Sequence, residues 1–216
     1  MDTKKIVVIS AGLGTPSSSR LLADQLGDAT ARLAAGLGFE AQITTYELRD
    51  LAVDIANNFV TGFAAPKLAA AIDAVERADA LIAVSPVFSA SYSGLFKSFI
   101  DLIDNKSLEG TPVLLGATGG SERHSMVLDF AMRPLFTYLR ADIMPTAVFA
   151  APMDWGQGSE GDVTAAGGLG ARIERAAGEL ASELADAHGG AAVPKVATRA
   201  EEKSFEELLA DLTGGR

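Results

Sequence analysis

The sequence predicts an α/β domain built on a doubly wound parallel sheet, with helices on both faces. Three observations lead to this fold class. Short apolar runs, such as residues 5–10 and 80–84, show no polar alternation, which is typical of strands buried on both faces. Longer amphipathic stretches separate these runs, and loops rich in glycine and serine follow several of them. Strands that alternate with helices in this way favour a parallel sheet.

The first half of the chain begins with the strand at residues 5–10, followed by a loop at residues 11–19. A helix is expected at residues 20–35, because leucine and alanine recur there at helical spacing and glycines follow. Residues 40–47 alternate enough to form a second strand. The pattern is lost over residues 48–65, which we expect to form a long, irregular connection.

The second half continues the alternation. Pro66 stands where proline favours the first position of a helix, and this helix should end near Arg77. The later elements are a strand at 80–84, a helix ending near Asp104, a strand at 111–117, a helix at 123–140, a strand at 144–150 and a helix ending near Asp186. Five strands joined in this way predict the flavodoxin-like strand order 2-1-3-4-5.

The chain is expected to divide into residues 1–188, the α/β domain, and residues 189–216, a linker with a short C-terminal helix. Gly-Gly-Ala-Ala-Val-Pro is typical of a linker, and Ser204 can cap a helix with an apolar face. This helix either docks on its own domain, frays in solvent or contacts a partner.

Composition excludes several classes of protein. The net charge of −10 argues against nucleic-acid binding, which needs clustered Lys and Arg. The chain has no cysteine, and His124 and His188 stand far apart, so neither thiol chemistry nor a metal site is expected. No apolar run approaches the roughly 20 residues of a membrane span, and no signal peptide is recognisable. We expect a soluble, cytoplasmic protein.

The first loop predicts a phosphate site. Gly12 and Gly14 allow a tight turn, and Ser17, Ser18 and Ser19 lie where the next helix begins. Backbone N–H groups and the helix dipole attract anions at such a place. Any one of these serines can instead be an N-cap, but three in succession favour a phosphate.

Two familiar nucleotide-binding motifs are absent from this loop. A dinucleotide fingerprint needs glycine at position 17, where Ser17 stands, and a P-loop needs Gly-Lys-Ser/Thr. A mononucleotide-like phosphate is therefore the expected ligand.

The loops after the third and fourth strands should emerge at the same edge of the sheet as the first. The second loop offers a stretch of backbone with Phe88 as a flat apolar neighbour, whereas Tyr92 and Phe96 are equally suited to the core, a dimer face or ring stacking. Residues 118–121 are small enough for a planar ring to approach their backbone, or they simply form a tight turn.

Residues 85–97, Ser-Pro-Val-Phe-Ser-Ala-Ser-Tyr-Ser-Gly-Leu-Phe-Lys, resemble the Pro-x-Tyr-x-x-Ser-Tyr-Ser-Gly-x-x-Lys segment of NADPH-dependent FMN reductases. Residues 117–121, with His124 and residues 129–134, are similar to the Ala-Thr-Gly-Gly-x-x-x-His…Asp-Tyr-Ala-x-x-Pro segment of one branch. That branch supplies reduced flavin to two-component monooxygenases of the alkanesulfonate, luciferase-like type. The resemblance extends from Lys5 to about Ala150.

The resemblance implies FMN and NADPH (or NADH) as cofactors and assigns roles to residues. The phosphate would be held by Ser10, Ser17 and Ser19, beside Ser18; the ribityl chain and ring edge would follow Pro86, Val87, Phe88 and Ser89; and the isoalloxazine would be flanked by Thr118, Gly119, Gly120 and Ser121.

Two departures from the family pattern stand out. The family's phosphate loop often carries an arginine between its serines, where this chain has Thr15-Pro16. Phe130 stands where alkanesulfonate reductases can place a tyrosine, in a helix tied to flavin transfer and oligomer state. His124 either faces a nucleotide, as the one candidate for a catalytic side chain, or is a polar surface residue. Asp129 and Arg133 are expected to form an i,i+4 pair.

We expect an NAD(P)H-dependent FMN reductase that transfers a hydride from nicotinamide to flavin N5 and supplies reduced flavin to a flavin-dependent monooxygenase. A quinone reductase with bound FMN, a flavodoxin-like electron carrier and a flavin- or nucleotide-binding regulator without enzymatic activity remain alternatives. A homodimer or homotetramer is implied by the resemblance, with residues 48–65 and the helix after the second loop as contact surfaces.

Overall fold

The computed structural model describes residues 2–156 and 168–186. The predicted linker and C-terminal helix at residues 189–216 lie outside these ranges, as does most of the polar loop expected before the last helix. The division of the chain at residue 188 therefore stays a prediction.

A seven-stranded sheet forms the centre of the molecule. Its path is β2-β1-β3-β5-β6, which matches the predicted order 2-1-3-4-5, and two short strands lie off it. All pairs are parallel except β3 with β4. The bounds are β1 Thr3–Ser10, β2 Glu40–Glu47, β3 Ala80–Phe88, β4 Ser91–Tyr92, β5 Pro112–Thr118, β6 Asp142–Ile143 and β7 Val148–Ala150.

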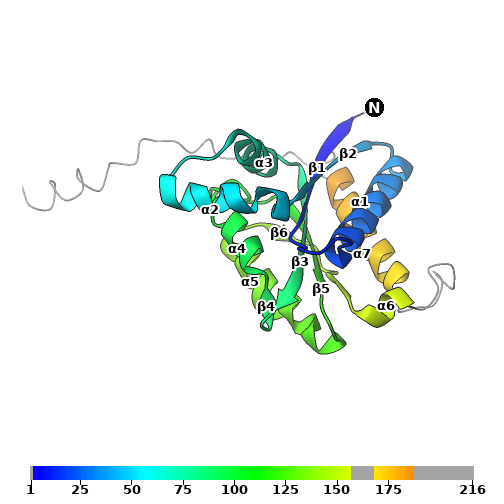
Figure 1. Ribbon diagram of the computed structural model, residues 1–216. Coiled ribbons are helices and arrows are strands. Elements are labelled where there is room, and N and C mark those ends of the chain that lie inside the picture. Colours follow the sequence, from blue (N-terminus) through cyan, green and yellow to red (C-terminus); the bar gives the residue numbers. More distant parts are fainter. Residues whose placement is uncertain (1, 157–167, 187–216) are drawn as a thin grey trace, which may run out of the picture.

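Helices cover both faces of the sheet, as predicted (Figure 1). One face carries α1 (Ser18–Gly36) and α7 (Leu169–Asp186), packed on Ile6, Val8 and Ile82 of the sheet. The other carries α2 (Ala52–Thr61), α3 (Pro66–Glu76), α4 (Gly94–Ile100) and α5 (Arg133–Tyr138), packed on alternate residues of the same strands. A short helix, α6 (Pro152–Gly156), follows β7. No helix within the described ranges is long and apolar enough to cross a membrane.

The expectation of an irregular segment at residues 48–65 is wrong. A 3₁₀ turn, η1 (Leu48–Leu51), leads directly into α2. Gly62, which looked like part of a loop, is the C-cap of α2: its φ is 74°, and its N–H donates to the carbonyl of Asn58 at 2.8 Å. Val, Asn and Thr are weak helix formers, so burial of Ile55 against the core decides this segment.

The helix expected at residues 123–140 is divided. A 3₁₀ turn, η2 (Glu122–Met126), a π-helical turn, η3 (Leu128–Met132), and α5 follow one another. Pro134 has no N–H to donate to the carbonyl of Phe130 four residues earlier, which agrees with a widened turn just before it. The predicted pair is confirmed, because Arg133 Nε donates to Asp129 Oδ1 at 2.9 Å.

Two strands differ from their predicted extent. The strand expected at 144–150 is split into β6 and β7 around Pro145, which cannot donate to the sheet. The carbonyls of Met144 and Pro145 instead accept from Arg133, at 3.2 and 2.6 Å. The strand expected at 80–84 continues to Phe88, so the start of the second loop is strand, and α4 ends at Ile100 rather than near Asp104.

Candidate functional site

The carboxyl ends of β1, β3 and β5 lie side by side and carry the three loops at one edge of the sheet. Ser10 is in register with Val84, and Pro86 with Thr118. Two backbone bonds extend the alignment into the loops: Ala11 N donates to Val84 O at 2.9 Å, and Gly119 N to Ala150 O at 3.1 Å. The prediction that the loops share one edge is confirmed.

The first loop wraps closely around the start of α1. Ser17 is the N-cap of that helix, and its Oγ accepts from the backbone N–H of Arg20 at 3.2 Å. A Cβ added to Gly12 would lie 1.9 Å from Ser17 Oγ and 3.1 Å from Ser19 Cβ, so only glycine fits the loop. The capping interpretation therefore holds for Ser17, whereas Ser18 is exposed.

Ser10 contributes a buried hydroxyl beneath the first loop. The residue is 1% exposed, and its Oγ has no hydrogen-bond partner among the residues that the structure describes. Buried hydroxyls nearly always have a partner, so this atom calls for an additional hydrogen-bonding group. Ser10 ends β1 two residues before Gly12, and Gly12 lies against Ser17 and Ser19 at the start of α1. We call this group of residues the cradle, because backbone N–H groups at the start of a helix favour an anion.

Ser19 links the first loop to the third. Its Oγ lies 2.7 Å from Thr118 Oγ1, and both residues are buried. The two are 99 positions apart in the sequence. This bond holds the start of α1 against the end of β5, and it was not predicted from the sequence.

Removing either partner of this bond should destabilise the protein, because the other hydroxyl remains buried and unpaired. We expect Ser19→Ala and Thr118→Val each to lower the free energy of unfolding by about 1–3 kcal/mol. The double variant should lose about 1 kcal/mol less than the sum of the two. Urea unfolding of the four proteins measures this coupling, and strictly additive losses would show that the bond contributes nothing.

The second loop is a β-hairpin rather than an open loop. Val87 pairs with Tyr92 and Phe88 with Ser91, and the two residues between them, Ser89 and Ala90, have φ of 49° and 66°. Positive φ at both central positions is typical of the tight turn that suits the twist of a hairpin. This turn projects from the edge of the sheet where the loops gather (Figure 1).

The predicted residues of the second loop differ in exposure. Pro86 is buried and Val87 half-buried, whereas Phe88 is 47% exposed at the end of β3. Tyr92 packs on Phe96, with ring centroids 5.8 Å apart, and Phe96 is fully buried. The core alternative is thus confirmed for Phe96, whereas Tyr92 is half-buried against the core. Phe88 is the aromatic that the hairpin leaves exposed.

The third loop has one crowded and one open glycine. A Cβ added to Gly119 would lie 2.9 Å from Phe149 Cζ and 3.1 Å from His124 Cβ, whereas one added to Gly120 would meet no atom within 4 Å. His124 is half-buried, and its Nδ1 is buried without a partner in the described part of the chain. Both alternatives for His124, contact with a nucleotide and a polar surface residue, stay predictions.

A pocket of about 390 Å³ opens between the hairpin and the helical turns after the third loop. Its walls combine polar and apolar groups: Ala90, Ser91, Arg123, His124, Met126, Val127, Phe130 and Ala131. Arg123 is exposed and has no ion-pair partner within the described ranges. The pocket thus adjoins Gly119 through His124 and offers one free guanidinium.

A second cavity, of about 550 Å³, lies away from these loops. It is lined by residues of β6 and α7, among them Asp142 and Glu179. Because β6 pairs with the first residues of β5, this cavity lies toward the amino ends of the strands. It does not join the three loops.

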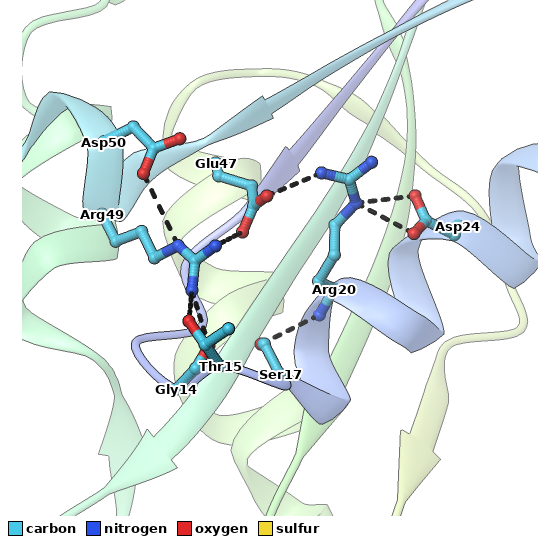
Figure 2. A network of polar contacts seen from close by, with 8 residues as sticks. All are labelled: Gly14, Thr15, Ser17, Arg20, Asp24, Glu47, Arg49 and Asp50. Atoms are coloured by element: carbon cyan, nitrogen blue, oxygen red, sulfur yellow. Dashed lines mark hydrogen bonds and ion pairs between the residues drawn. The ribbon is translucent and has the colours of Figure 1, made fainter.

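Two arginines lie near the first loop, and Arg49, whose guanidinium contacts it, was not predicted from the sequence (Figure 2). Arg49, in η1, donates to Gly14 O at 2.7 Å and Thr15 Oγ1 at 2.5 Å. Glu47 bridges Arg49 at 3.0 Å and Arg20 at 2.8 Å. The hydrogen bond from Arg20 to Asp24 raises the pKa of the Arg20 guanidinium, and its other carboxylate neighbour, Glu47, adds to this effect.

Comparison with known proteins identifies the family. A family model described as NADPH-dependent FMN reductase matches residues 4–156. The chain belongs to this family. The resemblance noted in the sequence is confirmed, and the fold is flavodoxin-like. The protein is accordingly an oxidoreductase that uses FMN and a nicotinamide nucleotide.

Relatives with assigned activities cover most of the chain. An FMN reductase (NADPH) of Pseudomonas aeruginosa is 40% identical over 151 residues, which span 70% of this chain and 78% of that one. The NADH-dependent FMN reductase SfnE of Pseudomonas putida is 37% identical over 183 residues, or 85% and 93% of the two chains. A solved oxidoreductase from Corynebacterium diphtheriae superposes with a TM-score of 0.79 at 43% identity, covering 86% and 99%.

Proposed function

We propose that the protein reduces FMN at the edge formed by the three loops and releases it to a flavin-dependent monooxygenase. The observation that supports this site best is the cradle of the first loop. The absence of a side chain at Gly12 lets Ser17 and Ser19 approach the backbone closely, and the buried Ser10 hydroxyl lacks a partner in the described structure. The family match supports FMN as the occupant.

The FMN phosphate would bind at the start of α1, beside Ser10, Ser17, Ser18 and Ser19. The loop at residues 11–19 has no charged side chain, so N–H groups and hydroxyls would carry the contacts. Because Ser17 Oγ already accepts from Arg20 N, it remains free to donate to a phosphate oxygen. Ser19 contacts Thr118 and acts through the shape of the site.

The ribityl chain and the ring would extend across the ends of β3 and β5. Pro86, Val87, Phe88 and Ser89 would follow the chain and ring edge, and Thr118, Gly119, Gly120 and Ser121 would flank the isoalloxazine. The accessible Phe88 and the open face of Gly120 support this direction. Bound FMN would supply the hydride-accepting chemistry at N5, and the residues at these strand ends would hold the two rings together and exclude water.

The nicotinamide nucleotide would approach through the pocket beside His124. Arg123 at its rim offers a positive charge to the phosphates of NADPH or NADH, and Met126 and Phe130 offer apolar contact. No acid or base is required for hydride transfer, so His124, which lines this pocket, would contact the nucleotide without exchanging a proton.

Purified protein should oxidise NADPH or NADH in the presence of FMN, measured as the loss of absorbance at the nicotinamide band. Turnover that requires added FMN supports the reductase. Firmly held FMN without nicotinamide turnover would instead favour the electron carrier, and turnover only with quinones would favour the quinone reductase. No turnover with either nicotinamide and any flavin contradicts the proposal.

Replacing Gly120 by alanine tests the position of the ring. The added methyl group meets no protein atom within 4 Å, so the melting temperature should not change. If the isoalloxazine lies there, the methyl group crowds it, and the Kd for FMN should rise about tenfold. Fluorescence titration with FMN measures this effect. If a stable variant keeps its FMN affinity, the ring does not bind at the third loop.

We further propose a homodimer or homotetramer. The surface of α2 and the turn after it exposes Val53, Phe59, Val60 and Phe63, with Val60 87% and Phe63 81% accessible. Large apolar side chains gathered on one surface mark a contact with another protein. Dependence on NAD(P)H suits a cytoplasmic location, which we propose together with the monooxygenase partner.

A further inference from the structure

The first loop is held from outside by a residue of a neighbouring segment. Arg49 Nη1 donates both to the carbonyl of Gly14, at 2.7 Å, and to Thr15 Oγ1, at 2.5 Å (Figure 2). Among the described residues, no other side chain outside the loop has a hydrogen bond to Gly14 or Thr15. We propose that Arg49 is a positioning residue for phosphate binding, an inference that rests on the proposed FMN site.

The bond to Gly14 sets the direction of a peptide group. In a trans peptide, the carbonyl and the next N–H point in opposite directions. The carbonyl of Gly14 faces Arg49, so the N–H of Thr15 faces away from it. The carbonyl of Gly14, which would repel an anion, is thus held against Arg49. The N–H of Thr15 is left pointing away from the guanidinium.

Arg49 is itself fixed by the fold. It lies in η1, whose Leu48 and Leu51 are buried, and η1 begins directly after β2. Its guanidinium also contacts Glu47 Oε2 at 3.0 Å and Asp50 Oδ1 at 3.5 Å. Because these contacts already fix the guanidinium, its binding to the loop costs little additional side-chain entropy. A solvated lysine would lose more.

The same guanidinium balances a carboxylate close to the loop. Glu47, which is only 17% exposed, lies between Arg49 and Arg20 (Figure 2). Without Arg49, Glu47 would keep one of its two cationic partners and would repel a phosphate dianion more strongly. Removal of Arg49 should therefore weaken phosphate binding in two ways, through loop geometry and through charge.

These contacts suggest how the loop manages without the arginine that the family often carries at Thr15-Pro16. Here the cation comes from η1 and binds the backbone of the loop instead of standing between its serines. An ordinary surface ion pair would predict no effect on ligand binding, because exposed pairs contribute little. The two interpretations differ in whether the phosphate group of the ligand matters.

Titration with FMN and with riboflavin, which lacks the phosphate, separates these interpretations. Arg49→Gln should raise the Kd for FMN about tenfold and change that for riboflavin less than about twofold. Arg49→Lys keeps the charge but cannot reach Gly14, Thr15 and Glu47 together. Its Kd for FMN should therefore lie between those of the unchanged protein and of Arg49→Gln. Arg77→Gln, which removes an equal charge from an exposed pair with Asp73, serves as the matched control.

Each outcome has one meaning. The role of Arg49 would be overturned if Arg49→Gln weakened the binding of FMN and of riboflavin equally. It would also be overturned if a variant with an unchanged melting temperature bound both ligands as tightly as before. If Arg77→Gln weakens FMN binding to the same extent, the effect comes from net charge alone. That result would also overturn the role of Arg49. If the unchanged protein binds FMN no better than riboflavin, the proposed phosphate site itself fails. If Arg49→Gln does not fold, the comparison passes to Arg49→Lys.

Discussion

Replacing Gly12 by valine should raise the Kd for FMN by about 100-fold or more, the largest effect expected of a single substitution here. A Cβ at this position would lie 1.9 Å from Ser17 Oγ and 3.2 Å from Ser17 Cβ, and valine adds two methyl groups beyond it. Ser17 would have to rotate away from the N–H of Arg20, and the phosphate cradle would be filled. Fluorescence titration with FMN measures the loss.

The control for this variant is Gly36, at the far end of the helix that follows the first loop. Gly36→Ala places its Cβ where no atom lies within 4 Å, and alanine favours a helix more than glycine does. It should keep FMN affinity and stability. Lost capping alone would cost Gly12→Val about 1 kcal/mol of stability. FMN affinity within about threefold of the unchanged protein would show that the phosphate binds elsewhere.

Replacing Val60 and Phe63 together by aspartate should convert the proposed oligomer to monomers. Large apolar side chains at the centre of an interface carry most of its binding energy, so the dissociation constant should rise by about 100-fold or more. Both side chains are highly exposed in the single chain, so the fold itself should be preserved. Size-exclusion chromatography with light scattering over a dilution series measures the change.

Leu37→Asp is the matched control, because Leu37 is an exposed apolar residue at the end of α1, on the other side of the sheet. It should leave the oligomer intact. An oligomer that survives the double substitution would place the interface elsewhere, and a monomeric unchanged protein would contradict the oligomer itself.

Local signals in the sequence predicted the fold well. Residues 40–47 form β2 with the expected bounds, and Pro66 begins α3. In both cases the pattern of side chains and the backbone preference agree within one segment. The segment containing α2 was mispredicted because its helix depends on burial of Ile55 against distant residues, which no short window contains.

The candidate site was predictable where it follows from strand ends and loop composition. That principle brought Ser10, Pro86 and Thr118 together correctly. It could not predict the bond between Ser19 and Thr118 or the role of Arg49, because both depend on which side chains meet across the finished sheet. Arg49 reaches the first loop only because β2 lies beside β1.

The bond between Ser19 and Thr118 has a consequence for the length of ligand that the proposed site accepts. It fixes the separation between the start of α1 and the end of β5, which would hold the phosphate and the ring respectively. A flavin with its phosphate on a chain shorter or longer than ribityl could not place the phosphate at the start of α1 and the ring at the end of β5 together. Selection among flavins would then depend on molecular length as well as on charge.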